Sequence, residues 1–126
     1  MENCMKYSVV VPVYNEEDGV LAFLEALRPI LEGQASSYEV IVVNDGSEDS
    51  TLQKLLSVEW QQLKIVDLIS NSGHMAALEA GLRTSAGEFI ITMDGDQQHP
   101  VELIPQLIEL QKNTSCDVVI LSLIHI

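Results

Sequence analysis

Basic residues are scarce in this sequence. Its 126 residues include six Lys or Arg against 19 Asp or Glu, which gives a formal net charge of −13. A charge of this sign argues against nucleic acid and against an anionic membrane surface as direct partners. A phosphate-bearing ligand would also be repelled unless a cation or backbone N–H groups came between it and the protein.

Long apolar runs are also missing, and none approaches the roughly 18 residues of a membrane span. The first residues lack the apolar core of a secretion signal. The two cysteines, Cys4 and Cys116, have neither metal-binding spacing nor a partner framework for disulfides. We therefore expect reduced thiols and a cytoplasmic protein. Nothing in the sequence indicates an oligomeric state.

Several catalytic signatures are absent as well. No G-x-G-x-x-G fingerprint follows the first apolar run, which disfavours NAD-type binding, and no P-loop signature occurs. No Ser/His/Asp arrangement typical of nucleophilic catalysis stands out.

The sequence does contain apolar runs rich in β-branched residues, alternating with segments of helical periodicity. The runs expected to be strands are residues 7–13, 38–43, 63–69, 89–93 and 117–120, with 63–69 the weakest and nearest a sheet edge. Helices are expected around residues 20–31, 52–56, 75–83 and 101–108. This βαβαβαβαβ order predicts an α/β protein with a doubly wound, mostly parallel sheet built from Rossmann-like βαβ units. Pro12 lacks an N–H, so we expect strand pairing to end there.

Ligands of such sheets bind beyond the carboxyl ends of the strands. That rule selects four loops, at residues 12–16, 43–47, 71–74 and 94–98, and these hold most of the chemically suggestive residues. The convergence of the four loops is stronger evidence for a site than any one motif.

The last of these loops carries Asp94, Asp96 and Gln98 after an apolar run. In an extended segment the side chains at this spacing point the same way, and three oxygen ligands suit Mg²⁺ or Mn²⁺. Gly95 leaves space for a ligand to approach the backbone. The alternative is an ordinary turn after a buried strand.

The other loops offer groups for a nucleotide. Tyr14 is suited to stacking on a base, with Asn15 and Glu16 forming hydrogen bonds to the base edge or the ribose, although a helix-entry turn is the alternative. Asp45 is suited to accept from a base N–H or a ribose hydroxyl, or is simply a turn aspartate. Gly73 and His74 lie just before an expected helix and are suited to bind a phosphate through N–H groups or the imidazole, although a structural role for the histidine is the alternative.

Four of these segments together resemble the family 2 glycosyltransferases with the GT-A fold. They are VVVPVYNEE at residues 9–17, VVNDGS at 42–47, NSGHMAAL at 71–78 and MDGDQQHP at 93–100. The last two resemble the branch that contains the polyprenyl-phosphate and dolichol-phosphate sugar transferases. The resemblance covers residues 7 to about 120.

The resemblance implies a role for each matching residue. The nucleotide of a UDP- or GDP-sugar would be held by Pro12, Tyr14, Glu16, Val43 and Asp45. Asp94 and Gly95 would lie against the ribose and diphosphate. Asp96 and Gln98 would ligate Mg²⁺ or Mn²⁺, with Asp94 beside or joining them, so that Asp96 acts in catalysis through the metal that stabilises the leaving group.

The resemblance further implies an inverting transfer to a polyprenyl phosphate, at the cytoplasmic face of a membrane in the complete protein. No general base is identified, but a lipid phosphate is already largely ionised near neutral pH, because such a second pKa is ~6.

The sequence departs from that branch at three places. Ser70 stands where arginine is common, and Ser72 where an aromatic residue is common. Residues 121–126 (LSLIHI) resemble no part of the family. We therefore expect a nucleotide-sugar-binding half at residues 1–120, a non-family tail at 121–126, and a truncated chain.

Three alternatives remain on sequence grounds. A signalling receiver domain would need an acidic pair after the first strand and a late lysine, whereas PVY follows that strand and no lysine follows Lys112. A nucleotidyltransferase would need a glycine-rich, basic loop at the same place. The third alternative is a nucleotide-sugar-binding fragment without turnover.

Overall fold

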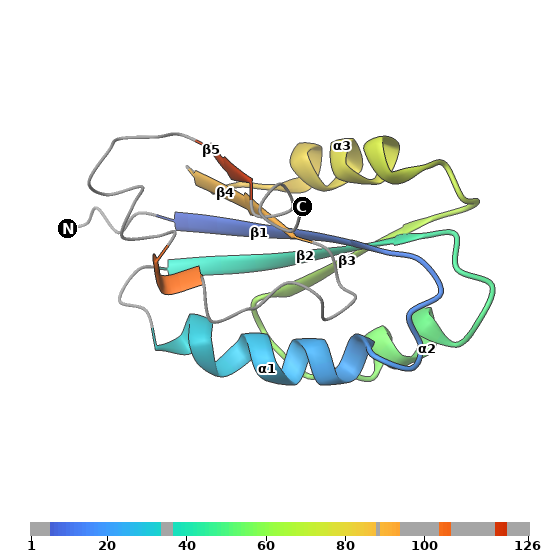
Figure 1. Cartoon of the computed structure of the whole chain (residues 1–126), viewed down its shortest axis with the longest axis horizontal. Helices are drawn as coiled ribbons and strands as arrows, with labels where there is room; N and C mark the ends of the chain where they lie inside the picture. Colours follow the sequence, from blue (N-terminus) through green and yellow to red (C-terminus); the bar gives the residue numbers. More distant parts are fainter. Residues whose placement is uncertain (1–5, 34–36, 88, 94–103, 107–117, 121–126) are drawn as a thin grey trace.

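A computed structural model describes residues 6–33, 37–87, 89–93, 104–106 and 118–120 (Figure 1). Five parallel strands form one sheet in the order β3-β2-β1-β4-β5. The strands are β1 (Lys6–Val13), β2 (Ser37–Asp45), β3 (Leu63–Leu68), β4 (Phe89–Thr92) and β5 (Val118–Ile120). The helices are α1 (Val20–Glu32), α2 (Thr51–Leu56) and α3 (His74–Thr84). Residues 104–106 are also helical, and the rest of the helix expected at 101–108 lies outside the described residues.

The strand order confirms the predicted doubly wound sheet, with β3 at the edge. After β3 the chain returns across the sheet to place β4 on the other side of β1 (Figure 1). Doubly wound sheets bind ligands where the strand order reverses in this way. The receiver domains considered above have the order 2-1-3-4-5, so the observed order excludes that alternative.

Helices cover both faces of the sheet, with α1 and α2 on one side and α3 on the other (Figure 1). Val9 and Val11 pack with Phe23 and other residues of α1, whereas Val10 packs on the opposite side with Ala77 of α3. β1 and β2 are both buried on two faces, which explains their continuous runs of β-branched residues.

α3 lies very close to the sheet because it presents a glycine. A Cβ on Gly81 would lie 2.4 Å from Cγ1 of Val10 and 3.1 Å from Cγ2 of Val43. Gly81 therefore allows this close helix–sheet packing.

Pro12 does not end strand pairing as simply as predicted. The register of β1 with β2 continues through Pro12↔Val43 and Val13↔Asn44, but the register with β4 ends at Val10↔Thr92. The carbonyl of Val10 accepts the Met93 N–H at 3.1 Å. The backbone N–H and C=O groups of Val10, and of every second residue after it, therefore point toward β4. The missing N–H of Pro12 therefore faces the β4 side, and the prediction was right for β4 and wrong for β2.

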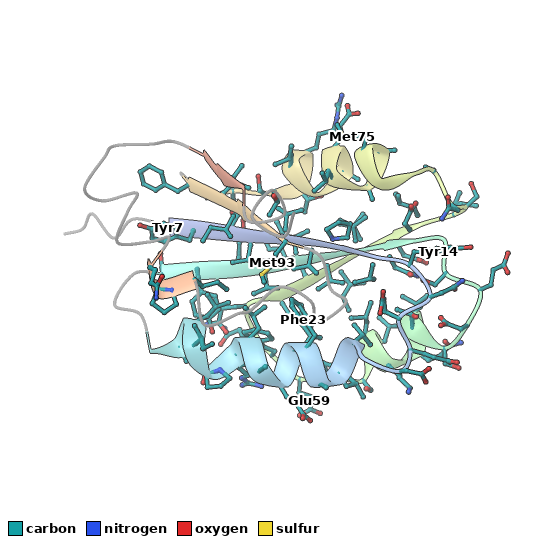
Figure 2. The ribbon with its side chains drawn as sticks, viewed as in Figure 1. Tyr7, Tyr14, Phe23, Glu59, Met75 and Met93 are labelled. Atoms are coloured by element: carbon teal, nitrogen blue, oxygen red, sulfur yellow. The ribbon has the colours of Figure 1, made fainter. Side chains whose placement is uncertain are left out.

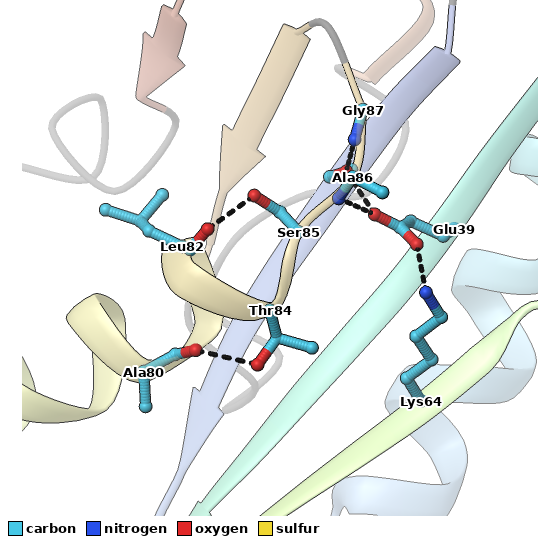
Figure 3. A network of polar contacts seen from close by, with 9 residues as sticks. Glu39, Lys64, Ala80, Leu82, Thr84, Ser85, Ala86 and Gly87 are labelled. Atoms are coloured by element: carbon cyan, nitrogen blue, oxygen red, sulfur yellow. Dashed lines mark hydrogen bonds and ion pairs between the residues drawn. The ribbon is translucent and has the colours of Figure 1, made fainter.

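A buried glutamate joins three strands near their amino ends (Figure 3). Glu39 of β2 is 3% exposed, and its Oε2 accepts from Ser8 Oγ of β1 and from the Ala86 N–H, each at 2.6 Å. Its Oε1 lies 2.8 Å from Lys64 Nζ of β3. The Ser8 hydroxyl in turn accepts the Gly87 N–H at 2.9 Å. This network fixes the segment that enters β4 against the two central strands.

The charge of Glu39 is stabilised by these partners. Burial by itself raises the pKa of Glu39, but the hydrogen bonds from Ala86, Lys64 and Ser8 outweigh it and lower the pKa from 4.5 to about 2. Because the folded-state pKa lies below the unfolded value, the resulting stability is present above pH 4.5 and is lost as the pH falls toward 2.

We expect Glu39→Gln to reduce the free energy of unfolding at pH 7 and to flatten its decline between pH 4.5 and 2. The Glu39 carboxylate of the wild type should contribute on the order of 3 kcal/mol to the free energy of unfolding, and this contribution is lost across that pH window. Urea unfolding at a series of pH values measures the contribution. The control is Glu79→Gln, which removes an exposed pair with Arg83 and should change stability at pH 7 by less than about 0.5 kcal/mol. Parallel pH profiles for wild type and Glu39→Gln would contradict the role of Glu39.

Candidate functional site

Three described loops meet at the carboxyl edge of the sheet, because all the strands run in the same direction. They are the β1–α1 loop (residues 14–19), the β2–α2 loop (46–50) and the β3–α3 loop (69–73). Figure 2 labels Tyr14 at this edge and Tyr7 at the opposite end of β1. β4 also ends here at Thr92, and residues 94–103 after it lie outside the described part of the chain.

Asn15 ties the β1–α1 loop to the β2–α2 loop. Its N–H donates to Ser47 Oγ at 2.9 Å, and its Oδ1 accepts the Glu48 N–H at 2.8 Å. Asn15 adopts φ 52°, a left-handed conformation that is uncommon outside glycine but tolerated by asparagine. Reciprocal bonds across the two loops account for this conformation.

The next residues extend the same connection. The Glu16 N–H donates to Thr51 Oγ1 at 2.9 Å, and Glu17 Oε1 accepts the Ser50 N–H at 2.9 Å. Lys54 Nζ donates to the carbonyl of Glu17 at 2.7 Å. The first two loops and the start of α2 are therefore one hydrogen-bonded unit.

Asp49 organises the start of α2, and sequence reasoning missed it. Its Oδ1 accepts the Thr51 N–H at 2.9 Å, and its Oδ2 accepts the Glu17 N–H at 3.3 Å. Desolvation raises the pKa of Asp49, but the bonds from Thr51 and Glu17 outweigh it and lower the pKa below its ordinary value. The Ser50–Gln53 spacing indicates a capping box, but this interpretation is wrong, because the Ser50 side chain makes no capping bond. An aspartate just before a helix was the available signal.

Asp45 holds the β3–α3 loop in place. It is 4% exposed, its Oδ1 accepts the Ser72 N–H at 2.8 Å, and its Oδ2 accepts the Gly73 N–H at 3.2 Å. The next residue, Gly46, has φ +69°, and a Cβ there would lie 2.3 Å from the backbone N of Asn71. The end of β2 and the β3–α3 loop are thus in direct backbone contact.

The structure brings several of the sequence-predicted residues to this edge. Tyr14 is 41% exposed there, and Asp45 and Gly73 are bonded to each other. Pro12 and Val43 face each other in neighbouring strands, and Val43 is fully buried beneath α3. The backbone of His74 begins α3, but its side chain lies outside the description.

The predicted metal residues are not among those described. Asp94, Gly95, Asp96 and Gln98 all fall in the segment that follows Met93, so their roles stay predictions. Within the described ranges, no three His, Cys, Asp or Glu side chains gather as a metal site would require. No helix in the same ranges is long and apolar enough to cross a membrane.

Comparisons with known proteins agree with this geometry. The sequence profile of glycosyl transferase family 2 matches residues 8–126. The undecaprenyl-phosphate 4-deoxy-4-formamido-L-arabinose transferase of Aeromonas hydrophila is 41% identical over 105 residues, which are 81% of this chain and 32% of that protein. The dodecaprenyl-phosphate galacturonate synthase of Rhizobium johnstonii is 35% identical over 119 residues, which are 92% of this chain and 35% of that protein.

A solved structure supports the fold in the same way. Residues 1–349 of S. aureus TarS, crystallised in complex with UDP-GlcNAc, match with a TM-score of 0.75 and 30% identity. The match covers 88% of this chain and 32% of that chain. The predicted GT-A type of α/β fold is thereby confirmed. The chain spans about a third of the length of the curated relatives it matches.

The contact between Gly46 and the β3–α3 loop gives a prediction. Gly46→Ala should lower the free energy of unfolding by more than the about 1–2 kcal/mol that left-handed backbone alone costs a residue with a Cβ, because the new methyl also meets the Ser70–Asn71 backbone. Denaturant unfolding measures this change.

Gly73→Ala measures backbone strain without a steric contact. Gly73 has φ +97° and ψ 158°, a region that costs residues with a Cβ about 1–3 kcal/mol, and a Cβ there would have no neighbour within 4 Å. A loss for Gly46→Ala of no more than about 1–2 kcal/mol, the cost of left-handed backbone alone, would show that the close approach at Gly46 does not exist in solution.

Proposed function

The chain belongs to glycosyl transferase family 2, and we propose that it is the nucleotide-sugar-binding part of an inverting glycosyltransferase that acts on a polyprenyl phosphate. The observation that carries this proposal is the joining of three loops at the carboxyl edge of the sheet, beside the end of β4. Doubly wound sheets bind nucleotides at such an edge. Loops that are already held by hydrogen bonds lose little conformational entropy when a ligand binds.

The donor is a UDP- or GDP-sugar on this proposal. The related TarS structure holds UDP-GlcNAc, which favours a uridine nucleotide. Tyr14 is the exposed aromatic group at the edge and stacks on the base. The residues that hold the nucleotide, directly or through the loops they shape, are Pro12, Tyr14, Glu16, Val43 and Asp45. Asp94 and Gly95 lie against the ribose and diphosphate, and Gly73 and His74 are near the phosphates.

A divalent cation completes the proposed site, because the chain has a net charge of −13 and would repel a diphosphate. Two carboxylates and a carboxamide, from Asp94, Asp96 and Gln98, are the oxygen donor set that Mg²⁺ or Mn²⁺ prefers. When bound, such an ion neutralises the departing diphosphate. Asp96 is the residue we assign to this role, and its part in catalysis is to hold the ion.

A lipid phosphate is the proposed acceptor. The names of two relatives specify undecaprenyl-phosphate and dodecaprenyl-phosphate. A phosphate oxygen of the acceptor attacks the anomeric carbon from the face opposite the diphosphate, and the bond from that carbon to the diphosphate oxygen breaks, so the configuration inverts. The attacking oxygen is already ionised near neutral pH, because such a second pKa is ~6. A general base is therefore not required of this chain.

The complete protein would work at the cytoplasmic face of a membrane, where polyprenyl phosphates present their head groups. Because this chain spans about a third of its relatives' length, donor binding is the part of the reaction expected of it. A nucleotide-sugar-binding fragment without turnover would have the same donor site. Binding measurements therefore test that alternative together with the proposed glycosyltransferase.

We expect UDP or GDP, or the corresponding sugar nucleotides, to stabilise the chain in the presence of Mn²⁺. A ligand at ~100 times its Kd adds about 2.7 kcal/mol to the free energy of unfolding. Thermal unfolding with and without nucleotide, each in Mn²⁺ and in EDTA, separates the metal-dependent part of the shift. Asp96→Ala should abolish that part.

Asp18→Ala is the control for general attraction of cations to an acidic protein. Asp18 is an exposed acid of the β1–α1 loop and has no proposed role in binding. Its removal should leave the metal-dependent shift in place. The absence of any shift in the wild type with every nucleotide would contradict the proposed function.

A further inference from the structure

We propose that Asn15 is a positioning residue, which holds the ring of Tyr14 in the direction that stacks on the base of the nucleotide. The sequence alone suggested that Asn15 itself forms a hydrogen bond to the base edge or the ribose. The inference rests on the proposed function, because it assigns a role within the same donor site.

Asn15 continues the connection between β1 and β2 beyond the point where strand pairing ends. The register of the two strands stops at Val13↔Asn44. Past that point, the Asn15 N–H donates to Ser47 Oγ at 2.9 Å, and Asn15 Oδ1 accepts the Glu48 N–H at 2.8 Å. The backbone and the side chain of one residue are therefore both bonded to the β2–α2 loop.

The backbone of Asn15 is held in a conformation that few residues adopt. Its φ is 52°, and in the described part of the chain it is the one residue other than glycine with a positive φ. Left-handed backbone is unfavourable for residues with a Cβ, although asparagine tolerates it better than most. The two bonds to the β2–α2 loop stabilise this conformation. Without them, rotation about the N–Cα bond of Asn15 would turn Tyr14 away from its present direction.

The direction of the Tyr14 ring depends on this backbone. Tyr14 is 41% exposed, and no other described aromatic ring packs on it. Tyr7, at the other end of β1, differs in this respect, because its ring centroid lies 5.6 Å from that of Phe89. A side chain that must be ordered on binding reduces the affinity for the ligand. Asn15 lowers that cost by fixing the backbone from which the Tyr14 ring extends.

A direct bond between Asn15 and the ligand is the competing explanation. Asn15 is exposed, and no described residue accepts from its side-chain NH₂ group. Positioning requires the acceptor Oδ1, whereas this ligand bond would use the NH₂ donor. Asn15→Asp keeps an acceptor for the Glu48 N–H and lacks the NH₂ group. Asn15→Gly tolerates the positive φ but lacks both groups.

Amide hydrogen exchange tests whether Asn15 holds the two loops together. In the wild type, the Glu48 amide should exchange at least about tenfold more slowly than in an unstructured chain, although Glu48 is an exposed loop residue. Asn15→Gly should remove most of this protection, because the acceptor is lost. Asn15→Asp should retain it.

Ligand affinity tests the role in the site. Titrations with UDP and GDP in Mn²⁺ are made well below the unfolding temperature and at high salt, which screens the charge added by aspartate. Asn15→Gly should weaken the nucleotide by at least about fivefold, because the Tyr14 ring must then be ordered on binding. Asn15→Asp should stay within about twofold of the wild type.

Asp18→Gly is the matched control for added glycine flexibility. Asp18 is an exposed residue of the same loop and has no proposed role in binding. This variant should bind within about twofold of the wild type, because it leaves the bonds of Asn15 in place.

Removal of the Tyr14 ring tests the route by which Asn15 acts. In a Tyr14→Ala background, Asn15→Gly should weaken binding by less than about twofold, because no ring is left to position. A direct ligand bond from the NH₂ group, or to the second lone pair of Oδ1, would instead give the same loss with and without Tyr14.

Three results would each overturn the inference: equal losses for Asn15→Asp and Asn15→Gly, equal losses with and without the Tyr14 ring, or an unprotected Glu48 amide in the wild type. The last of these needs no variant to fold. A wild-type chain that binds neither nucleotide contradicts the proposed function, and the inference with it. A wild-type chain that binds no better than Asn15→Gly overturns the inference alone, so the two failures are distinguishable.

Discussion

The parallel pairing of β1 with both β2 and β4 is the constraint on which the rest of the structure depends. It directs the carboxyl ends of all the strands to one edge, so segments that are distant in sequence meet there. It also buries the two central strands on both faces and requires a helix layer on each side. Gly81 lets α3 settle directly on Val10, and the reversal of strand order beside β1 leaves the edge open to a ligand.

Carboxylates hold this edge together, in a chain that has many of them. Asp45, Asp49 and Glu17 each accept backbone N–H groups from loops that would otherwise depend on water, and Glu39 does the same at the opposite end of the sheet. Hydrogen bonds to charged acceptors are the stronger ones, contributing about 1.5–3 kcal/mol. The acidity of the sequence therefore has a structural use, and it also explains why a diphosphate ligand would need a cation.

The sequence predicted the order of elements, the parallel sheet and the convergence of the loops, because these follow from local periodicity and from general rules of α/β topology. It did not predict what the loop side chains bond to. From the sequence, Asp45 was either an acceptor for a base or ribose or a turn aspartate, and its bond to the Ser72 N–H could not be predicted because the two residues are 27 positions apart. Ser50 and Gln53 have the spacing of a capping box, but the side chain that accepts a backbone N–H at the start of α2 is that of Asp49. Such contacts depend on the tertiary fold, and spacing along the chain does not encode them.

The central claim is that a nucleotide diphosphate binds at the carboxyl edge of the sheet. Titration of the ¹⁵N-labelled chain with UDP in Mg²⁺, followed residue by residue, tests it most directly. The largest shifts are expected in the β1–α1, β2–α2 and β3–α3 loops, at residues 14–19, 46–50 and 69–73, with the Ala86–Gly87 segment at the opposite edge unchanged. Shifts centred on Ala86–Gly87, or on the outer face of α1, would contradict the claim.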